Sequence, residues 1–332
     1  MNSLFSVLIV WLVSSSIGLA NFAYRLDAAG TRTNLVEYLS TTYRTNSWRF
    51  DPLYRLTNET ITGTAPTGTI GYTYDAVGNR LTRTSSVPNV ATTSANYGTN
   101  DWVTGDSYNN NGSTTNSGGN SYAYDFENRL TNFNNGTAVF VYDGDGNRVR
   151  KTVAGVTTYY LVDDRNPTGY AQVLEELTTV GATPSRLYTH GLDMISQRQS
   201  DGTTSFFGYD GNGNTRFLTS AAGAVTDTYT YEAFGVGIAG TGSTANNYLF
   251  AGEQYDSSLG FYYLRARYLN PGMGRFWTRD PFGGRRQEPD TLHKYLYCSD
   301  DPINRHDPSG YENTITVSGS FGIFGTLAAC RT

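Results

Sequence analysis

The chain has 332 residues and a net charge of −5, and only 16% of its residues are charged. Tyrosine and glycine are abundant, at 26 and 37 residues, which suits short strands joined by tight turns and excludes a helix bundle. Heptads typical of a coiled coil, glycine at every third position as in collagen, and a basic stripe for nucleic acid are all missing from the sequence.

The first 20 residues have the pattern of an export signal. Residues 4–13, LFSVLIVWLV, form an apolar run shorter than the ~20 residues that a membrane span needs, and Gly18 and Ala20 make a small-residue cleavage site before Asn21. The first three residues carry no basic side chain. We expect a signal peptide over 1–20, a secreted or cell-surface protein, and no stable membrane span. The alternatives are an apolar strand or an arbitrary start of a truncated reading frame.

One motif recurs between residues 48 and 235: aromatic, any residue, aromatic, acidic, followed in most copies by Gly-Asn-Arg and an apolar residue. A repeat of this kind indicates one supersecondary unit used many times. The copies are WRFDPLYRLT (48–57), YTYDAVGNRLTRT (72–84), YAYDFENRLTNF (122–133), FVYDGDGNRVRKT (140–152), FGYDGNGNTRFLTS (207–220) and YTYEAFG (229–235).

Each unit is predicted to be a β-hairpin. In the second copy, Tyr72 and Tyr74 alternate with a threonine and so lie on one face of a strand. Asp75 should end the strand by accepting bonds from the amides two and three residues on, and Gly78 should supply the left-handed position of a bulged turn. Hairpins side by side would share a continuous aromatic face. The polar stretch NNNGSTTNSGGN (109–120) is expected to be a long loop.

These repeats resemble the YD repeats of the rearrangement-hotspot (RHS) family, over most of residues 22–311. The segment AGEQYDSSLGFYYLRARYLNPGMGRFWTRDPFGG (251–284) is similar to the RHS-associated core. The pattern of that core is Tyr-Asp, Gly-Leu-Tyr-Tyr, Arg-x-Arg-Tyr-Tyr, Gly-Arg-Phe and Asp-Pro-x-Gly, and here Phe261 stands for its leucine and Leu269 for its last tyrosine. YLYCSDDPINRHDPSG (295–310) is similar to the family's closing segment and holds a second Asp-Pro-x-Gly.

The resemblance implies an all-β fold, in which antiparallel β-hairpin repeats form a curled or spiral β-sheet shell, here partial, with a C-terminal core segment. It divides the chain into the signal peptide (1–20), the repeats (21–245), the core (246–311) and a short variable tail (312–332). In the family the shell encloses a variable C-terminal polypeptide, often a toxin, and the core plugs or caps one end. The tail is shorter than the ~40 residues that a domain usually needs to fold alone, so we expect no toxin domain in it.

The core of many relatives resembles an aspartyl protease that cuts its own chain just after the closing Asp-Pro-x-Gly. By this resemblance the catalytic residues are Arg279, Asp280 and Asp307, and the cut falls between Tyr311 and Glu312. Two carboxylates close together in a partly dry site cannot both ionise, so one would activate water while the protonated one polarises the carbonyl. Arg279 would stabilise the oxyanion or hold one aspartate charged.

Three features qualify this site. Asp290 is a third, weaker catalytic candidate, RRQEPD (285–290) has the character of an insertion that must loop outward, and Tyr311 replaces the usual leucine. The alternative role of Asp280 and Asp307 is turn formation alone, because Asp-Pro pairs commonly start turns whose amides the aspartate caps.

No cofactor or metal is expected. Asp143–Asn147 resembles the start of an EF-hand loop, but Arg148 stands where that loop needs glycine. The expected partner is the chain's own C-terminal polypeptide, and nucleic acid is not expected as a partner.

Two other functions stay open. One is a cell-surface adhesion module whose tyrosine rows stack on cell-surface carbohydrate or the cell wall, and the other is an inactive gene fragment.

If the leader is a signal peptide, material secreted by an expressing host should begin near Asn21. Mass spectrometry of the secreted and cellular fractions measures this directly. Recovery of the protein with Met1 intact, or in the cytosol alone, would contradict the prediction.

Overall fold

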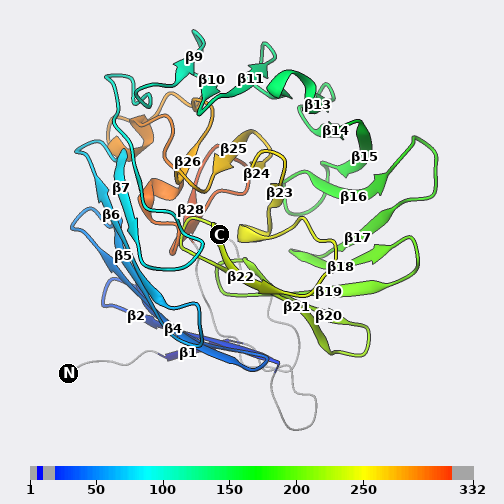
Figure 1. The fold of residues 1–332 in the computed structure, drawn as a ribbon, viewed down its shortest axis with the longest axis horizontal. Coiled ribbons are helices and arrows are strands. Elements are labelled where there is room, and N and C mark those ends of the chain that lie inside the picture. Colours follow the sequence, from blue (N-terminus) through cyan, green and yellow to red (C-terminus); the bar gives the residue numbers. More distant parts are fainter. Residues whose placement is uncertain (1–5, 10–18, 316–332) are drawn as a thin grey trace.

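The computed structural model describes residues 6–9 and 19–315. Two large antiparallel sheets curl around a smaller one, and each strand of the large sheets pairs with its neighbours in the chain (Figure 1). This arrangement confirms the predicted all-β fold of curled hairpin repeats. The helices within the described residues are single 3-10 turns: η1 (Asn134–Gly136), η2 (Phe250–Gly252), η3 (Pro289–Leu292) and η4 (Cys298–Asp300).

The strands of the two large sheets follow one another as a meander. The eight-stranded sheet holds β1 (Ser6–Ile9), β2 (Ala20–Leu26), β3 (Arg32–Leu39), β4 (Thr42–Phe50), β5 (Leu56–Gly63), β6 (Gly68–Tyr74), β7 (Arg80–Ser85) and β8 (Thr93–Ser94). The fourteen-stranded sheet holds β9 (Ser107–Tyr108), β10 (Thr114–Ser117), β11 (Asn120–Tyr124), β12 (Leu130–Phe133), β13 (Ala138–Tyr142), β14 (Arg148–Val153), β15 (Val156–Asp163), β16 (Gln172–Leu177), β17 (Arg186–His190), β18 (Met194–Gln199), β19 (Thr204–Tyr209), β20 (Thr215–Ser220), β21 (Val225–Tyr231) and β22 (Gly237–Thr241).

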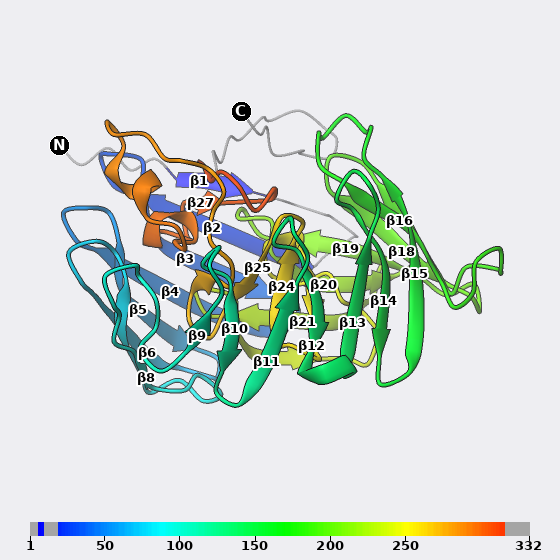
Figure 2. The same cartoon turned by 90° about the horizontal axis from the view of Figure 1, so that it is seen from above.

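The core segment lies inside this curl, as two perpendicular views show (Figures 1 and 2). It supplies a four-stranded antiparallel sheet and a final two-stranded ladder. The strands are β23 (Gln254–Asp256), β24 (Phe261–Leu264), β25 (Arg267–Asn270), β26 (Arg275–Phe276), β27 (Arg305–His306) and β28 (Thr314–Ile315).

The repeat turns form as the motif predicts, with one difference in detail. Asp75 Oδ1 accepts bonds from the amides of Val77, Gly78 and Asn79 at 2.8–3.0 Å, and Gly78 has a φ of +105°. The equivalent aspartates bind the amides two and four residues on, rather than two and three, because the bulge adds a residue to the turn. These aspartates are Asp27, Asp51, Asp125, Asp143 and Asp210.

In the five repeats whose second aromatic residue is tyrosine, this residue fixes its strand to the preceding one. A buried phenol needs a hydrogen-bond partner, and the hydroxyl finds it in a backbone carbonyl of the neighbouring strand. The five bonds run from Tyr74 to Leu56, Tyr124 to Thr114, Tyr142 to Leu130, Tyr209 to Met194 and Tyr231 to Thr215, at 2.7–3.0 Å.

The arginine of the repeat motif reaches either the next turn or the core segment. Arg55 donates to the Asp75 carbonyl of the next turn at 2.7 Å. Arg80 donates to the Gly272 carbonyl at 2.5 Å, and Arg148 pairs with Asp256, so these two side chains tie the curl to the core. Arg32 does the same at the other end of the core, where it donates to the Ile303 carbonyl at 2.9 Å.

The prediction of a long loop over residues 109–120 is wrong. Thr114–Ser117 forms β10, and Ser117 pairs with Asn120 across Gly118 and Gly119. Both glycines have a positive φ, of 56° and 84°, which is what a two-residue hairpin turn requires.

The predicted signal peptide lies mostly outside the described residues, which leave out 1–5 and 10–18. Within it, Ser6–Ile9 forms β1, paired antiparallel with β2. That pairing agrees with the alternative of an apolar strand. Cleavage before Asn21 stays a prediction.

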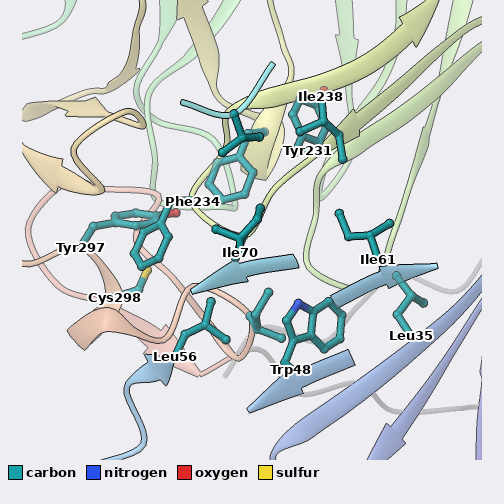
Figure 3. Close-up of a cluster of buried hydrophobic side chains, with 14 of the residues drawn as sticks. Leu35, Trp48, Leu56, Ile61, Ile70, Tyr231, Phe234, Ile238, Tyr297 and Cys298 are labelled. Atoms are coloured by element: carbon teal, nitrogen blue, oxygen red, sulfur yellow. The ribbon is translucent and has the colours of Figure 1, made fainter. Parts of the chain in front are cut away.

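Apolar side chains from both sheets and the core segment meet in one buried cluster (Figure 3). The first sheet contributes one face of β3 to β6, the last hairpin of the second sheet contributes its tip, and the core contributes the segment before η4. The labelled members are Leu35, Trp48, Leu56, Ile61, Ile70, Tyr231, Phe234, Ile238, Tyr297 and Cys298.

Two carboxyl groups meet inside the fold where β5 faces the turn after β21. Glu59 and Glu232 are each 1% exposed. The Ala233 amide donates to Glu59 at 3.0 Å, and the Tyr72 hydroxyl donates to Glu232 at 2.7 Å. Burial, and then the charge of Glu232, raise the pKa of Glu59 to about 8, so Glu59 holds a proton at neutral pH.

Replacement of Glu59 by glutamine should make the stability of the protein less dependent on pH. Folded Glu59 keeps its proton up to about pH 8, whereas the unfolded side chain loses it near its ordinary pKa of 4.5, so this group destabilises the wild type as pH rises through that range. Glu59→Gln keeps an acceptor for the Ala233 amide and does not ionise. Its free energy of unfolding, from denaturant titrations, should exceed that of the wild type increasingly from pH 4.5 to about pH 8. A constant difference across that range would contradict this.

Candidate active site

The two Asp-Pro turns of the core follow β26, which ends at Phe276, and β27, which ends at His306 directly before Asp307. Asp280 Oδ1 accepts the amide of Phe282 at 2.8 Å. Asp307 Oδ1 accepts the amides of Gly310 and Tyr311 at 2.8 and 3.2 Å. Both aspartates therefore cap turns, as the alternative role predicts.

The other carboxylate oxygen of each aspartate contacts one shared arginine. Arg267, at the start of β25, is 4% exposed; its Nη1 lies 2.9 Å from Asp280 Oδ2 and its Nη2 lies 3.5 Å from Asp307 Oδ2. The guanidinium lies 3.7 Å from the centre of the Phe276 ring, which covers it. Turn formation and a paired-carboxylate site thus use different oxygens of the same two side chains.

The Tyr311–Glu312 peptide bond, where the cut is expected, lies beside the guanidinium of Arg267. Arg267 Nη2 is 3.4 Å from the Tyr311 carbonyl oxygen, and Nε donates to the Gly310 carbonyl. Gly310 has a φ of +72°, and a Cβ there would lie 2.3 Å from the Leu264 carbonyl oxygen. The chain before Tyr311 is therefore pressed against the turn between β24 and β25, and only glycine fits.

The environment of Asp307 favours its protonated form. Burial raises the pKa of this carboxyl group, and the charge of Asp280 raises it further, whereas Arg267 and the hydrogen bonds from Ser309 and Gly310 lower it. The net pKa lies above its usual range. A raised pKa suits Asp307 to the role of the acid in catalysis by a pair of carboxyl groups.

The structure brings together three of the residues expected from the sequence, Asp280, Asp307 and Tyr311, and leaves two elsewhere. Arg279 is exposed, and its stem lies against Gly112. Asp290 is exposed and accepts a bond from the Ser299 hydroxyl at 2.7 Å.

Arg267 occupies the place that the sequence analysis gave to Arg279. It belongs to the Arg-x-Arg-Tyr part of the core pattern, and this pair of arginines in an apolar segment was the signal that could have pointed to it. The segment 285–290 loops outward as expected: the side chains of Arg285 and Glu288 are 55% and 51% exposed. From that loop, Arg285 approaches Glu312 at 3.8 Å.

The chain is similar to bacterial toxins. It is 30% identical over 287 residues to the tRNA nuclease WapA of Bacillus subtilis, which covers 82% of this chain. It is 36% identical over 73 residues to the toxin protein Tse5 of Pseudomonas aeruginosa, which covers 22% of the chain. No family model matches the chain.

The fold is similar to part of a chain in solved structures of Tc toxins that contain TccC3. The Photorhabdus luminescens Tc holotoxin pore with a mutated TccC3 matches 93% of the chain with a TM-score of 0.72 and 16% identity, and the TcdB2–TccC3 crystal structure matches 88% with a TM-score of 0.70 and 18% identity. This chain spans 12% of the length of WapA and 17% of these solved chains. The likenesses support the relation to the RHS family that the repeats indicate.

Two findings bear on the expectations about nucleic acid and the membrane. The nuclease names of the relatives weaken the expectation that nucleic acid has no part, although the name describes proteins of which this chain matches a small portion. In the part of the chain that the structure describes, no helix is long and apolar enough to cross a membrane.

Substitution of Gly310 by alanine should destabilise the protein by about 1–3 kcal/mol, because the added methyl group combines a strained φ with a contact to the Leu264 carbonyl. Gly283→Ala is the matched control, since a Cβ there meets no atom within 4 Å. Denaturant titration of both variants measures the difference. Equal stability of the two would show that the closing turn is not packed as described.

Proposed function

We propose that this chain is the shell-and-core part of an RHS protein that encloses its own C-terminal polypeptide and cuts itself after Tyr311. The contact of one buried guanidinium with Asp280, Asp307 and the Tyr311 carbonyl is the observation that carries this proposal. The curled hairpin repeats, and a fold similar to part of a Tc toxin chain, support the enclosing role. The names of the relatives, a tRNA nuclease and a toxin protein, support a toxin-associated protein. With the expected leader over 1–20, we propose that it acts outside the producing cell.

The proposed reaction is hydrolysis of the Tyr311–Glu312 peptide bond. The ionised carboxylate takes a proton from water, and the water oxygen attacks the Tyr311 carbonyl carbon. The protonated carboxyl group donates to the carbonyl oxygen, and Arg267 Nη2 stabilises the negative charge that develops there. The carbon–nitrogen bond then breaks as the Glu312 nitrogen takes the proton that the base removed from water and leaves as an amine. The carbonyl oxygen returns its proton to the acid, and the new carboxyl group of Tyr311 loses a proton to solvent and becomes a carboxylate.

Protonation assigns roles to the pair. Asp307, whose pKa is raised by burial, is the acid, and Asp280, less buried and 2.9 Å from Arg267, is the base. The cleavage rate should therefore fall as pH rises above the pKa of Asp307, because the acid is then lost. A time course of cleavage between mildly acidic and alkaline pH tests this, and a rate that rises throughout would contradict the assignment.

Asp280→Asn should remain whole while the wild type loses a C-terminal peptide of 21 residues. The substitution keeps the size of the side chain and its acceptor for the Phe282 amide but removes the base, which should slow cleavage about 100-fold to 10,000-fold. Intact-mass measurement of the folded protein over time follows the reaction.

Two further variants test the two arginines against each other. Arg267→Lys should slow cleavage, because an ammonium group cannot contact both aspartates and the carbonyl in the way that the planar guanidinium does. Arg279→Ala should cleave like the wild type. A wild type that stays full length under folding conditions at mildly acidic and neutral pH would reject self-cleavage and leave the turn role alone.

A further inference from the structure

A second arginine holds the chain that leads to the proposed cut. Arg265 lies in the turn between β24 and β25, with a φ of +57°. Its Nη1 lies 2.9 and 2.8 Å from the two carboxylate oxygens of Glu253 and also donates to the Pro308 carbonyl. Its Nε donates to the Ala171 carbonyl at 2.9 Å. One side chain thus joins the second sheet, the start of the core and the closing turn.

The turn that carries Arg265 contacts four consecutive carbonyl groups of the closing turn. These four carbonyls lead directly to the Tyr311–Glu312 bond, so the two residues of this turn and the first residue of β25 fix the approach of that bond. The donors and acceptors are Arg265 to Pro308, the Ala266 amide to Ser309 at 3.3 Å, Arg267 Nε to Gly310, and Arg267 Nη2 to Tyr311 at 3.4 Å.

We propose that Arg265, oriented by Glu253, is a positioning residue for self-cleavage, an inference that rests on the proposed function. The contacts of its guanidinium are with Glu253, Ala171 and Pro308, whereas both aspartates contact Arg267. Arg265 therefore acts through the closing turn and not on the reacting atoms. It holds the Tyr311 carbonyl where the two carboxyl groups and one water can reach it together.

The chemistry of the pair suits a positioning role. Glu253 is 6% exposed, and its two oxygens contact Nη1 of the guanidinium, while Nε donates to Ala171. Contacts at two different nitrogens fix the rotation of the guanidinium, so the direction of the donor to Pro308 is set. Lysine would keep the charge beside Glu253, but its single nitrogen cannot reach the carboxylate, Ala171 and Pro308 at once. Charge alone is therefore insufficient, and the shape of the guanidinium is required.

The test compares cleavage rates of the full chain by intact-mass measurement. Arg265→Lys and Glu253→Gln should cut about 10-fold to 100-fold more slowly than the wild type, since a misplacement of about 1 Å has an effect of that size. The pH profile should keep its shape, because the acid and the base are unchanged. Cleavage at the wild-type rate by folded Arg265→Lys would overturn the proposal, and so would a shifted pH profile.

The chain offers a matched control in Arg186→Lys. Arg186 also pairs with a buried glutamate, Glu176, at 3.3 Å, but on β17, in the second sheet. A loss of stability similar to that of Arg265→Lys, with cleavage at the wild-type rate, is the expected result. Equal slowing in both variants would mean that general loosening of the fold, and not positioning, slows the reaction.

A second measurement does not depend on cleavage by the variant. In the Asp280→Asn background, which should stay whole, Arg265→Lys should speed hydrogen exchange of the Gly310 and Tyr311 amides, which are bonded to Asp307. Unchanged exchange would overturn the proposal. A wild type that never cuts would reject the proposed function, whereas a wild type that cuts beside an equally fast Arg265→Lys would reject the positioning role alone.

Discussion

A guanidinium group removed from water needs acceptors for its N–H groups, and this need ties the curled sheets to the segment inside them. Arg148 is 3% exposed and contacts Asp256, Gln254 and the Tyr268 hydroxyl of the core. Loss of either partner of such a buried pair leaves an unpaired charge, at a cost of about 3–5 kcal/mol. Since several arginines of the curl donate to acceptors in the core segment, separating the two parts would leave these buried guanidinium groups without those acceptors.

The features that the sequence predicted correctly depend on neighbours in the chain. The alternation of Tyr72 and Tyr74, the aspartate cap and the left-handed Gly78 all act within one hairpin, and the structure forms them where the motif stands. The repetition of the hairpin then predicts the antiparallel curl, because strands that follow one another in the chain pair through the shortest connections. The polar stretch 109–120 failed as a prediction because composition hid a two-glycine turn, which depends on two residues and not on the average of twelve.

The candidate site shows the opposite case, because its contacts join residues far apart in the chain. The family pattern pointed to Asp280 and Asp307, which both contact Arg267, but it could not show which arginine lies between them. Arg279 is next to Asp280 in the sequence, yet its side chain is exposed, and Arg267 reaches both acids from β25. Proximity in sequence is a poor guide where the partners are set by packing between sheets.

The meander order of the strands has a consequence for the time at which this molecule becomes complete. Contacts between neighbouring strands close short loops, so the curl can grow hairpin by hairpin while the chain is being synthesised. The contacts with the core span much longer loops: Arg148 and Asp256 are 108 residues apart, and Arg32 and Ile303 are 271 apart. Arg267 and the closing turn thus come together only after the two large sheets have formed. A reaction that needs them is delayed until folding has finished, so the order of folding sets the time at which the reaction can begin.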